Sequence, residues 1–145
     1  MILISHRGNL NGPNRDQENH PDYIKSALSA GFNVELDLWK IENKLYLGHD
    51  GPQFLIKESF ICDTRFWVHA KNIDAAFHLT HLKMIHWFFH DQDDCVLTSS
   101  GFLWTFPGKK LTNKSIAVMP ERVSEPYDLS NCYGICTDYP YNYKQ

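Results

Sequence analysis

The chain has 145 residues, 43% of them hydrophobic, which favours a single globular domain over residues 1–145. A formal net charge of -3 and a sequence pI of about 6.2 exclude a global attraction to nucleic acid or anionic membranes. No segment approaches the roughly 20 consecutive apolar residues of a membrane span, and the first residues lack a secretory-signal pattern. We therefore expect a cytoplasmic protein with no membrane span and no nucleic-acid partner.

Four cysteines stand at positions 62, 95, 132 and 136, without the C-x-x-C spacing of metal or redox sites. In a domain of this size they are more easily explained as core thiols than as a disulfide framework. We therefore expect no disulfide bonds.

The first elements follow from hydrophobic runs and turn formers. Residues 2–5 are a compact apolar run, which predicts a buried strand. Residues 9–17 are rich in turn formers and predict a loop. Pro21 suits a first helical position and Gly31 a helix end, so a short amphipathic helix is predicted between them.

Residues 34–38 alternate apolar and acidic side chains, which is the two-residue period of a strand with two different faces. Glu35 and Asp37 should therefore point the same way. A hairpin over residues 39–47 is predicted to return His49 towards these acids.

A further strand is predicted over residues 66–71, followed by a helix over 73–83 that turns Ile73, Ala76 and Phe77 inward. The remainder reads as strands separated by turns, with no convincing amphipathic helix. These strands are predicted over residues 84–89, 95–98, 102–106, 115–119 and 133–136.

Several side chains at predicted strand ends suit phosphodiester chemistry. His6 and His49 are candidates for an acid/base pair, because imidazole titrates nearest to neutral pH. Arg7 can bond two phosphate oxygens at once, and Lys71 adds a compact positive charge. Each of the four could instead be an ordinary surface or ion-pair residue.

Two carboxylates on one strand face can bind a single divalent cation. The Cα atoms of Glu35 and Asp37 should lie roughly 7 Å apart, so both carboxylates can reach one ion. His69 shares a strand face with Lys71 and is therefore aimed at the same site. A solvated strand face is the alternative.

Other candidates carry less weight. Trp104, near a strand end, offers an apolar wall to an alcohol group, although core packing is the alternative. His78 and His81 have helical i, i+3 spacing but no evident third ligand, so we expect them to be structural.

The ordered motifs resemble the glycerophosphodiester phosphodiesterase family, within the superfamily of phosphatidylinositol-phospholipase-C-like phosphodiesterases. The match is dense over residues 2–50, thin over 72–132, and returns at the end of the chain. The matching residues are His6-Arg7-Gly8, Glu18-Asn19, Glu35-Leu36-Asp37, His49-Asp50, Lys71 and the terminal segment Gly134-Ile135-Cys136-Thr137-Asp138-Tyr139-Pro140.

The resemblance implies a TIM-type α/β barrel with its site at the carboxyl ends of the strands. It implies that His6 and His49 act as general acid and base, and that a substrate hydroxyl attacks the phosphorus to form a cyclic phosphate. Arg7 and Lys71 would grip the phosphate.

The resemblance also implies a divalent metal held by Glu35 and Asp37, normally magnesium or calcium. Glu18 and Asp50 would be further ligands or residues that orient the site. Family members usually have an acid where His69 stands. An imidazole there shifts the preference towards manganese or zinc, or replaces the cation altogether.

A second departure is size, because a TIM barrel typically needs about 250 residues. A reduced barrel with several outer helices missing, mainly in the second half, is therefore expected. Bare strand exteriors then require either a homo-oligomer or a polar outer face.

The sequence thus predicts a metal-assisted phosphodiesterase of lipid metabolism that cleaves a small glycerophosphodiester. A non-catalytic domain that binds a phosphodiester or sugar phosphate, with an altered metal site, is the alternative. A lyase that releases the cyclic phosphate is the third possibility.

Overall fold

The computed structural model describes residues 1–144, in which one ten-stranded sheet is accompanied by two α-helices. The strands are β1 (Ile2–His6), β2 (Asn33–Ile41), β3 (Lys44–Leu47), β4 (Phe54–Ile56), β5 (Phe66–Ala70), β6 (His86–Phe89), β7 (Cys95–Leu97), β8 (Leu103–Thr105), β9 (Ser115–Val118) and β10 (Gly134–Thr137). The helices are α1 (Pro21–Ser29) and α2 (Ile73–Leu79), with short 3₁₀ turns η1 (Glu58–Cys62), η2 (Pro120–Arg122) and η3 (Pro140–Tyr143).

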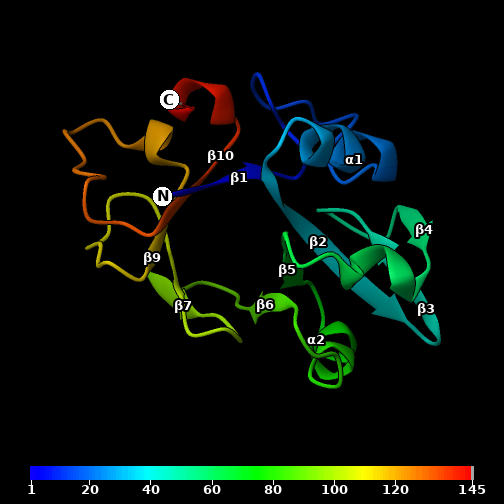
Figure 1. The fold of residues 1–145 in the computed structure, drawn as a ribbon. Coiled ribbons are helices and arrows are strands. Elements are labelled where there is room, and N and C mark those ends of the chain that lie inside the picture. Colours follow the sequence, from blue (N-terminus) through cyan, green and yellow to red (C-terminus); the bar gives the residue numbers. More distant parts are fainter. Residues whose placement is uncertain (145) are drawn as a thin grey trace.

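Eight of the strands curl into a partial barrel in the order β7-β8-β9-β10-β1-β2-β5-β6 (Figure 1). Their pairings are parallel except for the antiparallel β7–β8 pair. The end strands β6 and β7 form no ladder in the described chain, but the Ser99 amide donates to the Trp87 carbonyl at 2.8 Å. The chain is therefore a mixed α/β protein with a curled, incompletely paired sheet.

The side chains of β2 alternate between two environments, as predicted. Val34, Leu36 and Leu38 are fully buried on the outer face, where they pack in one cluster with α1, α2 and β3. Glu35 and Asp37 point to the concave side and are also buried. The prediction that both acids share one face, opposite an apolar face, is confirmed.

The concave side is filled by stacked aromatic rings together with aliphatic side chains. Trp104 of β8 stacks on Phe88 at 4.6 Å between ring centroids and on Trp67 at 5.9 Å. The other buried members of this inner cluster are Ile4, Ile116, Val118, Met119 and Cys136. The aromatic layer forms the floor beneath the polar groups at the carboxyl ends of the strands.

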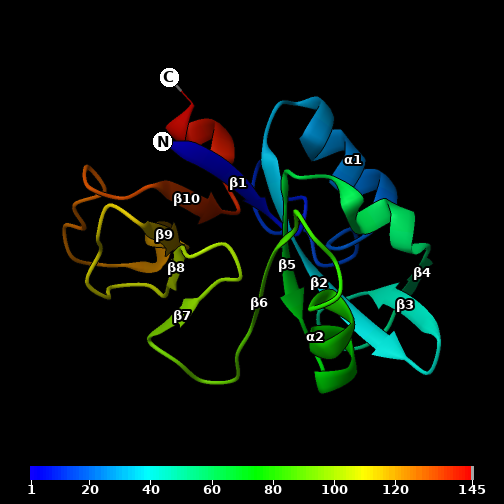
Figure 2. The same ribbon diagram turned by 60° about the horizontal axis from the view of Figure 1, so that its bottom comes forward.

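Both α-helices precede β6 in the chain and lie outside β2 and β5, as the two views show (Figures 1 and 2). Within residues 1–144 no α-helix follows β6, so loops and 3₁₀ turns accompany the strands from β6 to β10. The expected loss of outer helices in the second half is confirmed. No helix in the described part of the chain is long and apolar enough to cross a membrane.

The prediction for α2 was wrong in both length and orientation. The helix ends at Leu79, and its buried side chains are Ala75 and Leu79. Of the three residues expected to face inward, Ala76 packs partly buried against the core, whereas Ile73 and Phe77 are 75% and 67% exposed. Ala75 and Leu79 are spaced i, i+4 and face β2 and β5. The sequence carries two overlapping apolar stripes, and only contact with the sheet selects between them.

The cysteine prediction was correct in one part and wrong in another. All four cysteines are free, but only Cys136 is buried, while Cys62 and Cys95 are exposed. Cys95 lies on the end strand β7, which has only one strand neighbour and so buries little of its surface.

Candidate active site

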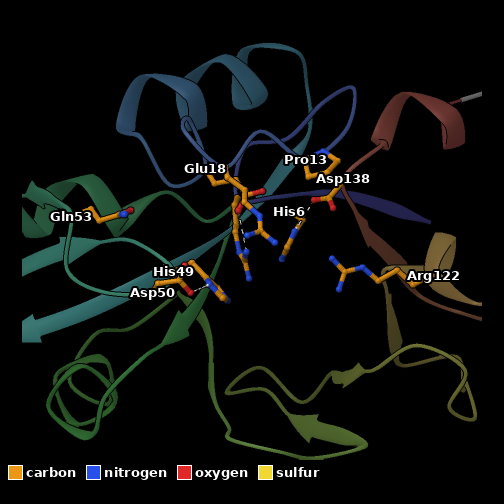
Figure 3. A pocket seen from close by; sticks show the side chains of 10 residues that line it. His6, Pro13, Glu18, His49, Asp50, Gln53, Arg122 and Asp138 are labelled. Carbon is orange, nitrogen blue, oxygen red and sulfur yellow. Dashed lines mark hydrogen bonds and ion pairs between the residues drawn. The ribbon is translucent and has the colours of Figure 1, made fainter.

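Two adjoining cavities open at the carboxyl ends of β1, β2 and β5. One has a volume of about 240 Å³ and the other about 460 Å³, and both are lined by His6, Arg7 and His49. The smaller one is shown from close by in Figure 3, with His6 between His49 and Arg122. Together they form a cleft centred on the predicted catalytic and phosphate-binding side chains.

A tight turn after β1 presents the first three residues of the site. Arg7 and Gly8 both have left-handed backbone conformations, with φ of 55° and 91°. A Cβ on Gly8 would lie 2.8 Å from Tyr23 Cδ1, so a larger residue there would clash with α1. The turn leaves His6 at the strand end and sends the Arg7 side chain into the cleft.

His6 is held by a carboxylate from the last strand of the sheet. Its Nδ1 lies 2.7 Å from Asp138 Oδ1, which also accepts a hydrogen bond from Asn9 Nδ2 at 2.9 Å. Burial opposes ionisation of Asp138, but the His6 hydrogen bond and charge lower its pKa overall. An ionised Asp138 holds a proton on His6 Nδ1, so Nε2 is the ring nitrogen that can exchange a proton in the cleft.

His49 reaches the cleft because the hairpin folds back along β2. Gly48 N donates to the Asp37 carbonyl at 3.2 Å, and Gly48 O accepts from Trp39 Nε1 at 2.7 Å. His49 Nδ1 then pairs with Asp50 Oδ1 at 2.6 Å. The cleft therefore contains two histidines that are each oriented by an aspartate.

The two pairs differ in exposure. The His49 side chain is 41% exposed, against 10% for His6. Partial burial and the charge of Arg7 lower the His49 pKa, and Asp37 and Asp50 offset this only in part. His49 is therefore neutral at pH 7, the form that accepts a proton.

Arg7 is held by carboxylates on two sides. Its Nη1 donates to Glu18 Oε2 at 3.0 Å, and its Nε lies 3.0 Å from Asp37 Oδ2 as an ion pair without hydrogen-bond geometry. Glu18 also accepts from Asn9 at 2.9 Å. These contacts fix the plane of the guanidinium, so Glu18 is a residue that orients Arg7.

Asp37 is the most heavily contacted acid of the site. Its Oδ2 accepts from Asn19 Nδ2 at 2.9 Å, while Oδ1 lies 3.1 Å from His69 Nδ1 and 3.4 Å from Lys71 Nζ. Full burial opposes its ionisation, but the His69 hydrogen bond and the charges of Arg7 and Lys71 outweigh burial and lower the Asp37 pKa. Asp37 is thus a buried anion at the centre of a cationic shell.

Glu35, two residues earlier, has the opposite environment. Burial first, and then repulsion by Asp37, raise the Glu35 pKa despite the nearby positive groups. Among residues 1–144 its Oε2 is buried with no hydrogen-bond partner, and the closest basic atom is His6 Nε2 at 3.9 Å. Ionised Glu35 therefore lacks a partner in this arrangement.

Ligand atoms of Glu35, Asp37 and His69 lie within 4.8 Å of one another, which is the geometry of a candidate cation site. The donor set fits a divalent ion, because a cation here would supply the partner that Glu35 Oε2 lacks. Two carboxylates with one imidazole favour manganese or zinc over calcium. An ion would compete with Lys71 for Asp37 Oδ1.

The other predicted residues lie around this cluster in different roles. Within the described chain, Glu18 and Asp50 do not belong to the three-residue cation cluster and contact Arg7 and His49 instead. Trp104 is only 3% exposed, yet it lines the larger cavity, so it is both core and wall. His78 pairs with Glu58 at 2.9 Å, away from the cleft.

The larger cavity has an aromatic side that continues the inner stack. His90 lies 4.6 Å from His69 and 4.7 Å from Phe106, measured between ring centroids. Burial and the charge of His69 lower the His90 pKa. The side chains of His90, Trp104 and Phe106 give this cavity a wall of flat rings.

Sequence reasoning did not assign a role to Asp138, Asn9 or Asn19. Asp138 meets His6 because β1 pairs in parallel with β10, a contact between opposite ends of the chain. Asp138 directly follows the strand predicted over residues 133–136, but no local pattern in the sequence pairs that strand with the first one. Asn19 follows Glu18 in a motif whose second residue was left without a function.

Comparisons of the chain with protein-family models, with curated proteins and with solved structures found no match. Functional inference therefore depends on the geometry of the cleft and on the order of the motifs.

Proposed function

We propose that this protein is a phosphodiesterase that cleaves a small glycerophosphodiester, with its partial barrel a reduced form of the TIM barrel. The observation that carries the proposal is the presence of two histidine–aspartate pairs, His6–Asp138 and His49–Asp50, on one cavity with Arg7. Phosphodiester cleavage needs a base for the attacking oxygen, an acid for the leaving oxygen and positive charge at the phosphate.

Arg7 and Lys71 supply the positive charge at the phosphate. Both side chains line the larger cavity, and both are anchored by Asp37 from below. Anchoring reduces the reorganisation that would otherwise accompany phosphate binding. The phosphate would sit above Asp37, within reach of both histidines.

The histidines then divide the proton transfers. Neutral His49 accepts the proton of a substrate hydroxyl as its oxygen attacks the phosphorus. His6 delivers a proton from Nε2 to the leaving alkoxide while Asp138 stabilises the charged ring. Cleavage of the phosphorus–oxygen bond yields a cyclic phosphate and an alcohol, and water opens the ring with the two roles reversed.

Glu35, Asp37 and His69 are the residues that would hold a divalent cation. When bound, such an ion supplies additional positive charge to the phosphate in the transition state. Without the ion, the His69 ring still contacts Asp37 and stacks on the aromatic wall.

The test is hydrolysis of a panel of glycerophosphodiesters by metal-stripped protein, with Mg²⁺, Ca²⁺, Mn²⁺ or Zn²⁺ restored. We expect turnover with at least one metal, best with Mn²⁺ or Zn²⁺, and loss of turnover in His49→Ala. Absence of turnover with every metal would overturn the proposal and favour a domain that binds a phosphodiester without cleaving it. Accumulation of the cyclic phosphate would identify a lyase.

A further inference from the structure

Two of the four arginines form no ion pair within residues 1–144 and lie on the same cavity. Arg7 and Arg65 contact carboxylates at 3.0 and 2.7 Å. Within residues 1–144, no carboxylate lies within the 4.0 Å ion-pair distance of Arg15 or Arg122. Both arginines line the smaller cavity, beside His6 (Figure 3 shows Arg122).

Both arginines are carried by turns anchored to the backbone of Asp138. On one side, Gly12 N donates to Asp138 O at 2.9 Å and secures the loop that contains Arg15. On the other, Glu121 Oε1 accepts from Asp138 N at 3.1 Å and from Thr137 Oγ1 at 2.9 Å. Glu121 directly precedes Arg122, so the same residue that orients His6 also locates both arginines.

The two cavities, on either side of the proposed scissile phosphate, are lined by different kinds of side chain. Both contain His6, Arg7 and His49, so a phosphate held there would direct one alcohol into each cavity. The larger cavity has the flat rings of Trp104 and Phe106. The smaller one has Arg15 and Arg122 instead.

We propose that Arg15 and Arg122 form a second anion subsite that binds a phosphate monoester on one alcohol of the diester substrate. This inference rests on the proposed function and specifies its substrate class, a glycerophosphodiester with a terminal phosphate. A dianionic phosphate suits two guanidinium groups, because each can bond two oxygens in parallel. The acids of this cavity already have close partners, since Glu18, Asp50 and Asp138 contact Arg7, His49 and His6. Arg122 adds only a longer-range attraction that helps to lower the Asp138 pKa.

The experiment compares glycerophosphoglycerol with the same diester carrying a terminal phosphate monoester. We measure kcat/KM for both substrates in the wild-type protein, in Arg15→Gln/Arg122→Gln and in Arg65→Gln. Arg65 is the matched control, since it precedes β5 at the opposite end of the strands and binds Asp63.

We expect the wild-type protein to prefer the phosphorylated substrate by about tenfold or more, the effect of one to two charge-assisted hydrogen bonds. The double variant should lower that ratio to about one, while Arg65→Gln should retain it. A wild-type ratio near one, or a preference retained in the double variant, would overturn the subsite and leave the proposed function standing.

Absence of turnover for both substrates would instead refute the proposed function. In that case, calorimetric titration with the phosphorylated diester tests binding at the subsite independently of turnover. Binding about tenfold weaker in the double variant than in Arg65→Gln would support the subsite, and equal binding would overturn it.

Discussion

The two halves of the partial barrel, the strands from β1 to β5 and those from β6 to β10, differ in the side chains that they contribute. The strands from β1 to β5 have aliphatic outer faces covered by both helices, and their ends carry most of the charged groups of the cleft. The strands from β6 to β10 are without α-helices in the described chain and contribute aromatic rings to the inner cluster. In the proposed reaction, the first half would therefore supply the reacting groups, while the second half shapes the cleft and, through Asp138, holds His6.

The largest effect is expected at His6, the first-half residue most central to the cleft. His6→Gln removes the proton donor and acceptor at the leaving oxygen, so kcat should fall about 10³-fold or more. Steady-state kinetics on a glycerophosphodiester measures this, with the exposed second-half His81→Gln as control. A loss below tenfold would contradict the assignment of chemistry to the first half.

Asp37→Asn should be the most destabilising change in the cleft. It leaves Arg7, Lys71 and His69 around a neutral amide, at an expected cost of about 3–5 kcal/mol. Because the folded-state pKa of Asp37 is depressed, its stabilisation is complete above the unfolded value near 3.8 and is lost as pH falls towards the folded value.

Urea unfolding at pH 7 measures the Asp37 effect, with Asp63→Asn as the matched surface control, since Asp63 pairs with Arg65 at the surface. A destabilisation below about 1 kcal/mol would show that the cationic shell does not depend on Asp37.

Asp138→Asn tests the main contribution of the second half to the chemistry. Loss of the carboxylate removes the group that selects the His6 tautomer, and kcat should fall about 100-fold while KM changes little. The variant should also shift the pH dependence of kcat, which a purely structural role would not do. An unchanged kcat would mean that Asp138 has no part in the proton transfers of His6.

Glu35→Gln should increase stability, in contrast to the change two residues away. The Glu35 pKa is raised in the folded state, so its ionisation costs stability as pH rises above about 4.5. Metal-free Glu35→Gln should therefore be more stable than the wild-type protein at pH 7, and the gain should shrink at pH 5. Thermal unfolding at both pH values measures it, and a loss of stability at pH 7 would contradict the unpartnered carboxylate.

Phe106→Leu should give the smallest effect, because it alters only the aromatic wall. We expect KM to rise about threefold with kcat nearly unchanged, since an apolar contact to one alcohol is weakened. The conservative Trp104→Phe provides a second measurement on the same wall. A fall in kcat larger than the rise in KM would mean that Phe106 contributes to the reaction step and not only to binding of the alcohol group.

Local pattern predicted the strands of both halves, including all five from β6 to β10, but it missed β4 and the inward face of α2. The alternation around Glu35 and Asp37 was sufficient to place both acids on the concave side. The return of His49 followed from a short hairpin. These features depend on neighbours within about 15 residues along the chain.

Features that depend on distant contacts could not be predicted. Asp138 meets His6 only because the last strand pairs with the first, and Arg122 reaches the same cavity through Glu121. The inward face of α2 depends on the sheet beneath it. The homo-oligomer stays a prediction, to be measured by light scattering.

Phosphorus NMR of glycerophosphoglycerol incubated with the wild-type protein and Mn²⁺ tests the proposed cleavage most directly. We expect the diester resonance to be replaced by that of glycerol phosphate or its cyclic ester, and His6→Gln/His49→Gln to leave the diester intact. A diester that persists with the wild-type protein under Mg²⁺, Ca²⁺, Mn²⁺ and Zn²⁺, or disappears equally fast with the double variant, would contradict this expectation.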